Sequence, residues 1–138
     1  MKIVIKNSRV VFARPKGWVE ISPSEVINSC YYEHTYQKSA YDNDAYSVFV
    51  YNLKEGDKVL IQGKIGSGQY LMQYGVFKTK ESDKIYTNKI TGKHFLEAGT
   101  EVTLNDELLI TESCYLLVQR ASNENPGISV KKFFDPIN

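Results

Sequence analysis

The sequence has few cysteines, few prolines, no long apolar run and almost no excess of either charge. No segment approaches the roughly 18 consecutive apolar residues of a membrane-spanning helix. The apolar residues at the start of the chain are interrupted by residues 6–9, KNSR, before a signal-peptide core can form. We therefore expect neither a transmembrane helix nor a secretion signal.

The charge balance argues against a protein that binds nucleic acid electrostatically. The 17 basic and 16 acidic residues give a formal charge of +1, and the basic residues are spread along the chain. A nucleic-acid binder of that kind shows a clustered basic excess.

The two cysteines, Cys30 and Cys114, lie too far apart in sequence to indicate a disulfide framework or a metal site. With no export signal, we expect two reduced thiols and no bridge. Cys114 precedes an apolar run and fits a small buried side chain. A chain of 138 residues is enough for one domain that buries its own core without a covalent staple.

Known catalytic and metal-binding motifs are missing as well. His34 and His94 are the only histidines, and their spacing does not match a ligand set. The sequence contains neither G-x-S-x-G nor H-E-x-x-H, and the glycine-rich residues 63–68 do not fit a phosphate-binding loop.

Loop carboxylates leave two weak alternatives. Glu25 and Glu33, with several loop aspartates, could supply a glycosidase pair, but the separation of the carboxyl groups is not readable from sequence. Residues 42–44, DND, match only the first half of an EF-hand loop. Two interpretations of this segment therefore remain, a structural calcium site and a solvated turn. We expect a protein that is not an enzyme, with no metal ligands and no cofactor.

The chain is rich in β-type patterns. In residues 46–66, YSVFVYNLKEGDKVLIQGKIG, two alternating runs flank Lys54-Glu55-Gly56-Asp57. Alternation with period two is typical of strands, and Gly and Asp favour a tight turn. We predict a β-hairpin here. In the later run QYLMQYGVFK, Gly75 indicates a bulge or a close approach.

Similar short runs, separated by turn signals every 8–12 residues, continue to the end of the chain. This pattern predicts eight to ten strands and no helix, which is typical of an all-β, jelly-roll-like β-sandwich. Two proline-containing breaks separate residues 1–22 as an N-terminal β-arm from a sandwich domain at residues 23–138. The predicted core positions are Phe49, Val59, Ile61, Val76, Val102, Leu116 and Val118.

Residues 28–45 are polar, aromatic and poorly periodic, which predicts a long ordered loop with one short strand near Tyr31. Six of the ten tyrosines lie between residues 31 and 51. Aromatic faces can stack on sugar rings or anchor a protein contact, or they can fold inward. The candidate contact residues for a glycan or a partner are Tyr31, Tyr32, Tyr36 and Tyr41.

Residues 46–130 resemble a group of β-sandwich modules. The likeness is carried by YSVFVYNLKEGDKVLI, YLMQYGVFK, GTEVTLNDELLITESCYLLVQ and ISVKK. This order of strands and turns is similar to jelly-roll domains of fibre and capsid-decoration proteins from tailed phages of gut bacteria, and to carbohydrate-binding modules. The resemblance implies a virion component, made in the host cytoplasm without a signal peptide, and it assigns no residue a role.

Our first hypothesis is a non-enzymatic virion subunit that self-associates, with a trimer favoured, and docks to other virion proteins through residues 1–22. That segment is more apolar than a free arm should be. The candidate interface residues are Ile3, Val4, Val10, Val11, Phe12 and Trp18. The alternative is a carbohydrate-binding module that uses the tyrosine-rich loop. Neither hypothesis involves nucleic acid or a membrane.

Overall fold

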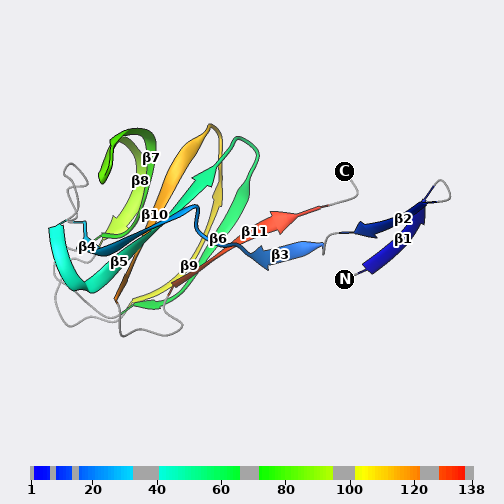
Figure 1. Ribbon diagram of the computed structural model, residues 1–138, viewed down its shortest axis with the longest axis horizontal. Helices are drawn as coiled ribbons and strands as arrows, with labels where there is room; N and C mark the ends of the chain where they lie inside the picture. The colour runs from blue at the N-terminus through cyan, green and yellow to red at the C-terminus, as the bar shows by residue number, and fades with distance from the viewer. Residues whose placement is uncertain are drawn as a thin grey trace.

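The computed structural model describes residues 2–6, 9–13, 16–32, 41–65, 72–94, 102–121 and 128–135, with side chains for 16–32, 45–63, 72–94, 103–120 and 128–135. These residues form antiparallel strands and turns without a helix (Figure 1). One sheet has the order β4 (Glu25–Tyr31), β5 (Tyr41–Leu53), β10 (Cys114–Ala121), β7 (Met72–Ser82), β8 (Ile85–His94). The second has the order β3 (Gly17–Glu20), β11 (Ile128–Phe134), β6 (Lys58–Ile65), β9 (Val102–Leu109).

The connections between the two sheets give jelly-roll topology. From β5 onward the chain passes from the five-stranded sheet to the four-stranded sheet and back, and only β7 and β8 are consecutive neighbours within one sheet. Eight strands interlock in this way, and β4 adds a ninth at the edge beside β5. The predicted fold class is confirmed.

The two sheets enclose an inter-sheet core. Val59 and Ile61 of β6 meet Leu116 and Val118 of β10, and all four side chains are fully or almost fully buried. Alternate residues of a strand share a face, so every second position of these strands points into this space. The predicted core residues Val59, Ile61, Val76, Leu116 and Val118 are confirmed, whereas Phe49 is only partly buried and the Val102 side chain is outside the described set.

The opposite face of the five-stranded sheet carries a second core, which we call the outer core. All of its residues come from that sheet or directly follow one of its strands. Val48, Val50 and Leu117 form its floor, and Phe77 and Tyr86 pack from β7 and β8. The remaining members are Ile27, Cys30, Tyr32 and Met72. The sheet therefore covers part of its own outer face.

Irregular backbone lets the sheet curl this far. The β4–β5 pairing shifts register between Asn28 and Cys30, where Ser29 has a φ of 56°. The β7–β8 pairing shifts three times and includes positive φ at Lys84 and Asn88. Bulges of this kind increase local twist and bend a strand pair. In Figure 1 the far half of β7 and β8 consequently bends over the sheet.

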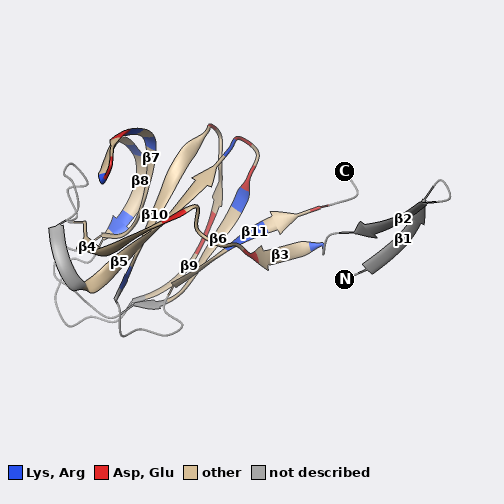
Figure 2. Cartoon of the chain, in the orientation of Figure 1, with Lys and Arg blue, Asp and Glu red and all other residues tan. Residues whose placement is uncertain are grey.

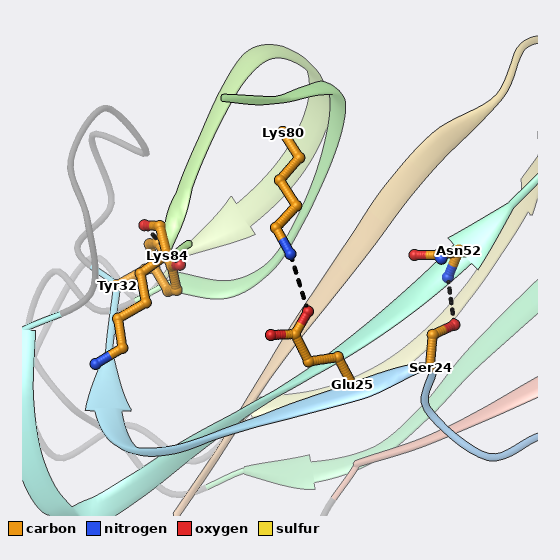
Figure 3. Close-up of polar contacts among 6 residues, drawn as sticks. All are labelled: Ser24, Glu25, Tyr32, Asn52, Lys80 and Lys84. Atoms are coloured by element: carbon orange, nitrogen blue, oxygen red, sulfur yellow. Dashed lines mark hydrogen bonds and ion pairs between the residues drawn. The ribbon is translucent and has the colours of Figure 1, made fainter. Parts of the chain in front are cut away.

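Side chains join the opposite edges of the curled sheet (Figure 3). The Lys80 ammonium group lies 3.1 Å from a Glu25 carboxylate oxygen on β4. The Tyr32 hydroxyl donates a 3.0 Å hydrogen bond to the Lys84 carbonyl in the β7–β8 turn. At the other end of β4, the Asn52 backbone N–H donates to the Ser24 hydroxyl at 3.0 Å. The first two contacts hold β4 beneath the β7–β8 hairpin, and the third fixes the start of β4 to β5.

The predicted hairpin at residues 46–66 is wrong, because β5 and β6 belong to different sheets. β5 pairs with β4 and β10, and β6 pairs with β11 and β9. The turn is instead an arch across the sandwich, and the buried Asp57 carboxylate fixes it. One oxygen accepts the Lys54 N–H at 2.9 Å, and the other pairs with Lys132 at 3.1 Å.

Two further expectations change. Half of residues 28–45 are strand, since β4 extends to Tyr31 and β5 begins at Tyr41, whereas the sequence predicted a long loop with one short strand; residues 33–40 lie outside the described residues. Residues 17–20 form β3, which pairs with β11 as an edge of the sandwich, although the predicted boundary at residue 22 assigned them to the arm. Before β3, β1 (Lys2–Lys6) and β2 (Arg9–Ala13) form a two-stranded sheet of their own.

The predicted bulge or close approach at Gly75 is confirmed. A Cβ atom built there would lie 2.7 Å from Phe77 Cε2 and 3.1 Å from Met72 Sδ. Phe77 and Met72 are outer-core residues, and the ladder shifts register on both sides of Gly75. The glycine is needed for a close approach rather than for its backbone angles.

Candidate functional site

The predicted tyrosine cluster divides into different environments. Tyr31, at the end of β4, is partly buried and packs edge-to-face on Tyr46 of β5, with ring centroids 5.7 Å apart. Tyr41 pairs with Tyr31 in the backbone register, but its side chain lies outside the described set. Tyr36 lies outside the described residues. The only described aromatic pair at this end of the sheet thus includes Tyr46, which was not among the candidates.

Tyr32 is not available as a stacking surface, which corrects its selection as a contact residue. Its side chain is 2% exposed and belongs to the outer core, and its hydroxyl is bonded to the Lys84 carbonyl. Burial raises the pKa of the Tyr32 hydroxyl far above its ordinary value, and the nearby Cys30 and Tyr86 act in the same direction. The ring supports the fold.

A buried glutamine lies beside Tyr32 and was not predicted. Gln119 on β10 has no exposed surface, and its Oε1 accepts the Tyr32 backbone N–H at 2.7 Å. The Tyr32 carbonyl in turn accepts the Met72 N–H at 3.0 Å. Gln119 thereby links β10 to the chain leaving β4. A polar residue in the strand run YLLVQ was the sequence signal for this contact, because buried polar groups are normally hydrogen-bonded.

The cysteines occupy separate cores. Cys30 lies in the outer core and Cys114 in the inter-sheet core, and both are reduced and buried. Burial raises the pKa of the Cys114 thiol, with a further contribution from Glu112 and Asp57. These are the properties of packing residues rather than of reactive thiols.

The candidate interface residues of the N-terminal segment also lie in two places. Ile3, Val4, Val10, Val11 and Phe12 are in the β1–β2 hairpin, where the register sets Ile3 across from Phe12. Trp18 is on β3, 36% exposed, and packs edge-to-face on Phe133 at 5.4 Å. The Lys58 ammonium group lies 5.7 Å from the Trp18 ring centroid, so this indole already has partners within the sandwich.

An apolar depression opens between the edge strands β8 and β9. It encloses about 60 Å³, and its walls include Val76, Ile90, Leu108, Ile110 and Cys114. Ile90 is 47% exposed, and Leu109 at the rim is 68% exposed. They are the two most exposed of the large hydrophobic residues in the described part of the chain. No local sequence pattern indicates this site, because its residues come from three separate stretches of the chain, around Val76, residues 90–91 and residues 108–114.

Farther along β9, a polar network joins β9 to β7 and β8 across the same side of the sandwich. The Tyr74 hydroxyl donates to Asp106 Oδ2 at 2.6 Å, and the Lys93 ammonium group lies 2.7 Å from the same oxygen. Burial raises the pKa of Asp106, but hydrogen bonds from Lys93 and Tyr74 outweigh it, so the pKa lies below its ordinary value. This network ties β8 to β9 beside the depression.

The described surface offers no concentrated charge and no ligand cluster. Figure 2 shows Lys and Arg interspersed with Asp and Glu over the described strands and turns. Within the described ranges, no group of three or more His, Cys, Asp and Glu side chains could hold a metal ion. Those ranges also contain no helix long and apolar enough to cross a membrane.

Comparison of the chain with protein-family models, with curated proteins and with solved structures finds no match.

Proposed function

We propose that this protein is a non-enzymatic structural subunit that assembles with copies of itself through its N-terminal hairpin. We place the assembled subunit in a virus particle, as a fibre or capsid-decoration protein that docks to other virion proteins. The sandwich provides a rigid body, and the hairpin provides the contact.

The observation that carries the proposal is the separate β1–β2 sheet. Neither strand pairs with a described strand of the sandwich. Its register puts Ile3, Ile5, Val10 and Phe12 on one face, because cross-strand partners share a face and faces alternate along a strand. A two-stranded hairpin is marginally stable by itself in water. An apolar face of this kind is stabilised by packing against another surface.

Two features support the virion setting. The order of strands and turns in residues 46–130 resembles jelly-roll modules of phage fibre and decoration proteins. The sandwich has jelly-roll topology with an added edge strand, and such sandwiches serve in viral capsids among other assemblies.

Light scattering of the purified full-length chain tests self-assembly. We expect an oligomer whose mass falls to that of the monomer when Phe12→Asp places a charge on the apolar face of the hairpin. A wild-type chain that stays monomeric at high concentration contradicts the proposal. For the setting, mass spectrometry of purified particles should detect the chain in a fixed ratio to the major capsid protein, and its absence from particles would remove the virion assignment.

Carbohydrate binding is a second candidate because Tyr31 and Tyr46 form an aromatic pair that is still partly exposed. Rings of this kind can stack on the apolar face of a sugar. A glycan array should then show hits that Tyr46→Ala abolishes and Trp18→Ala leaves unchanged. An empty array, or hits that survive Tyr46→Ala, would exclude this pair as a glycan site.

A further inference from the structure

We infer that the apolar depression between β8 and β9 receives the β1–β2 hairpin of a second copy of the chain. This inference rests on the self-assembly proposed above and names the surface that accepts the hairpin. The chemistry of the two partners, the edges of the sheets and the distribution of charge each support it.

The two surfaces match in chemistry. The depression has aliphatic walls, and Ile90 and Leu109 expose a large part of their side chains beside it. The hairpin presents aliphatic and aromatic residues on one face. Contiguous exposed apolar surface usually marks a site of contact with another molecule. Burying the two surfaces against each other removes both from water.

The strand edges around the depression can also hold a strand. β9 pairs only with β6 among the described strands, and β8 pairs only with β7, so each leaves one edge of its sheet open. An open edge presents backbone N–H and C=O groups that an added strand can satisfy. The hairpin can therefore lie along β9, beside Leu109, with backbone hydrogen bonds while its apolar face packs toward Ile90 on β8.

Charge favours a contact between the hairpin and a sandwich. Residues 1–19 contain five of the 17 basic residues and none of the 16 acidic ones, so residues 20–138 hold 12 basic and 16 acidic groups, a formal charge of −4. Glu112 lines the depression but is paired with Lys78 at 3.6 Å, so the attraction comes from the overall charge of the sandwich and not from this rim alone. A basic hairpin is thus drawn to an acidic sandwich at low salt.

The position of the tether favours a second copy over the same chain. The hairpin is joined to β3 by residues 14–16, and β3 is the edge of the four-stranded sheet opposite to β9. Two strands, β11 and β6, separate those edges, which puts them about 14 Å apart at the usual strand spacing. To reach its own depression the hairpin would have to double back across that sheet, whereas a neighbouring copy meets no such obstacle.

Sedimentation velocity with full-length variants tests the inference. The acceptor variant, Ile90→Lys/Leu109→Lys, places two cations where the basic hairpin would dock. The matched control is Val26→Lys, because Val26 is also an exposed edge-strand residue, 40% exposed, on β4 at the other side of the sandwich. We expect the acceptor variant to raise the dissociation constant at least ~10-fold, and the control to change it less than ~2-fold.

Mixing distinguishes docking onto another copy from any other role of these residues. Phe12→Asp disables the hairpin but keeps the depression, and the acceptor variant does the reverse. Each should be monomeric alone, and together they should form a 1:1 complex that does not grow further.

The outcomes separate this inference from the proposed function. A wild-type chain that is monomeric overturns both. A wild-type chain that self-associates, with an acceptor variant that associates equally well or a mixture that forms no complex, overturns the docking surface and leaves self-assembly standing.

Discussion

The sandwich and the N-terminal hairpin are built from the same kind of alternating strand, but they differ in where their apolar residues go. In the sandwich, β5 and β10 have apolar side chains on both faces, and both faces are covered by other parts of the chain. In the hairpin, the apolar face shared by Ile3 and Phe12 belongs to a sheet that pairs with no described strand of the sandwich.

This difference separates residues that stabilise the fold from residues that serve assembly. Changes within the two cores should lower the free energy of unfolding of each chain. Changes in the hairpin should alter association and leave the sandwich intact.

Two adjacent leucines of β10 should contribute equally to the free energy of unfolding, although they pack into different cores. Leu116 faces the inter-sheet core and Leu117 the outer core, and neither has any exposed surface. Truncating either to Ala should cost about 3 kcal/mol, as for other buried leucines. Chemical denaturation measures this. A cost below about 1 kcal/mol for Leu117→Ala alone would mean that the outer core is not a true core.

Loss of the arch carboxylate should have the next largest effect. Asp57→Ala removes the acceptor for the Lys54 N–H and the partner of Lys132, both in a partly buried setting. We expect a cost of about 2 kcal/mol, because buried groups left without partners are expensive. Glu55→Ala, at an exposed position of the same turn, is the control and should change stability by less than about 0.5 kcal/mol. Equal effects would contradict the structural role of Asp57.

Acid should weaken the tie between β8 and β9. The pKa of Asp106 is lower in the folded chain than its ordinary value, so its contribution to stability is present above that value and is lost as the pH falls through the folded pKa. Asp106→Asn should cost about 1–2 kcal/mol at pH 7, and the cost should shrink as the pH falls through the folded pKa. Unfolding curves over this pH range measure the difference. A cost independent of pH would exclude the ionised carboxylate as its source.

The smallest effect on stability should come from the hairpin. Phe12→Asp changes a strand that pairs with no described strand of the sandwich, so it should change the unfolding of the monomer by less than about 0.5 kcal/mol. Dilute samples are required, so that association does not contribute to the measured stability. A large destabilisation of the dilute monomer would show that the hairpin packs on its own sandwich.

The sequence predicted the positions of strands much better than their partners. Apolar residues at every second position, Val59 and Ile61 on β6 and Leu116 and Val118 on β10, identified the inter-sheet core correctly. The turn at residues 54–57 was also located, but the same Gly and Asp residues serve a hairpin or an arch. The apolar residues on both faces of β5, such as Val48 beside Phe49, were a signal that it is a central strand in a sheet covered on both sides.

The candidate site was less predictable for two physical reasons. A bulge with positive φ at Ser29 breaks the alternation of β4, so Cys30 and Tyr32 point into the outer core while the surrounding sequence looks like an irregular loop. The depression at Ile90 and Leu109 depends on two edge strands from different sheets meeting in space. No local pattern records that meeting.

Hydrogen exchange at two protein concentrations tests the central comparison most directly. The backbone amides of β5 and β10 should be strongly protected at both concentrations, because the sandwich is complete within one chain. The amides of residues 2–6 and 9–13 should exchange rapidly where the chain is monomeric and become protected where it is associated. Equal protection of the hairpin in the dilute monomer and in the associated protein would contradict the account.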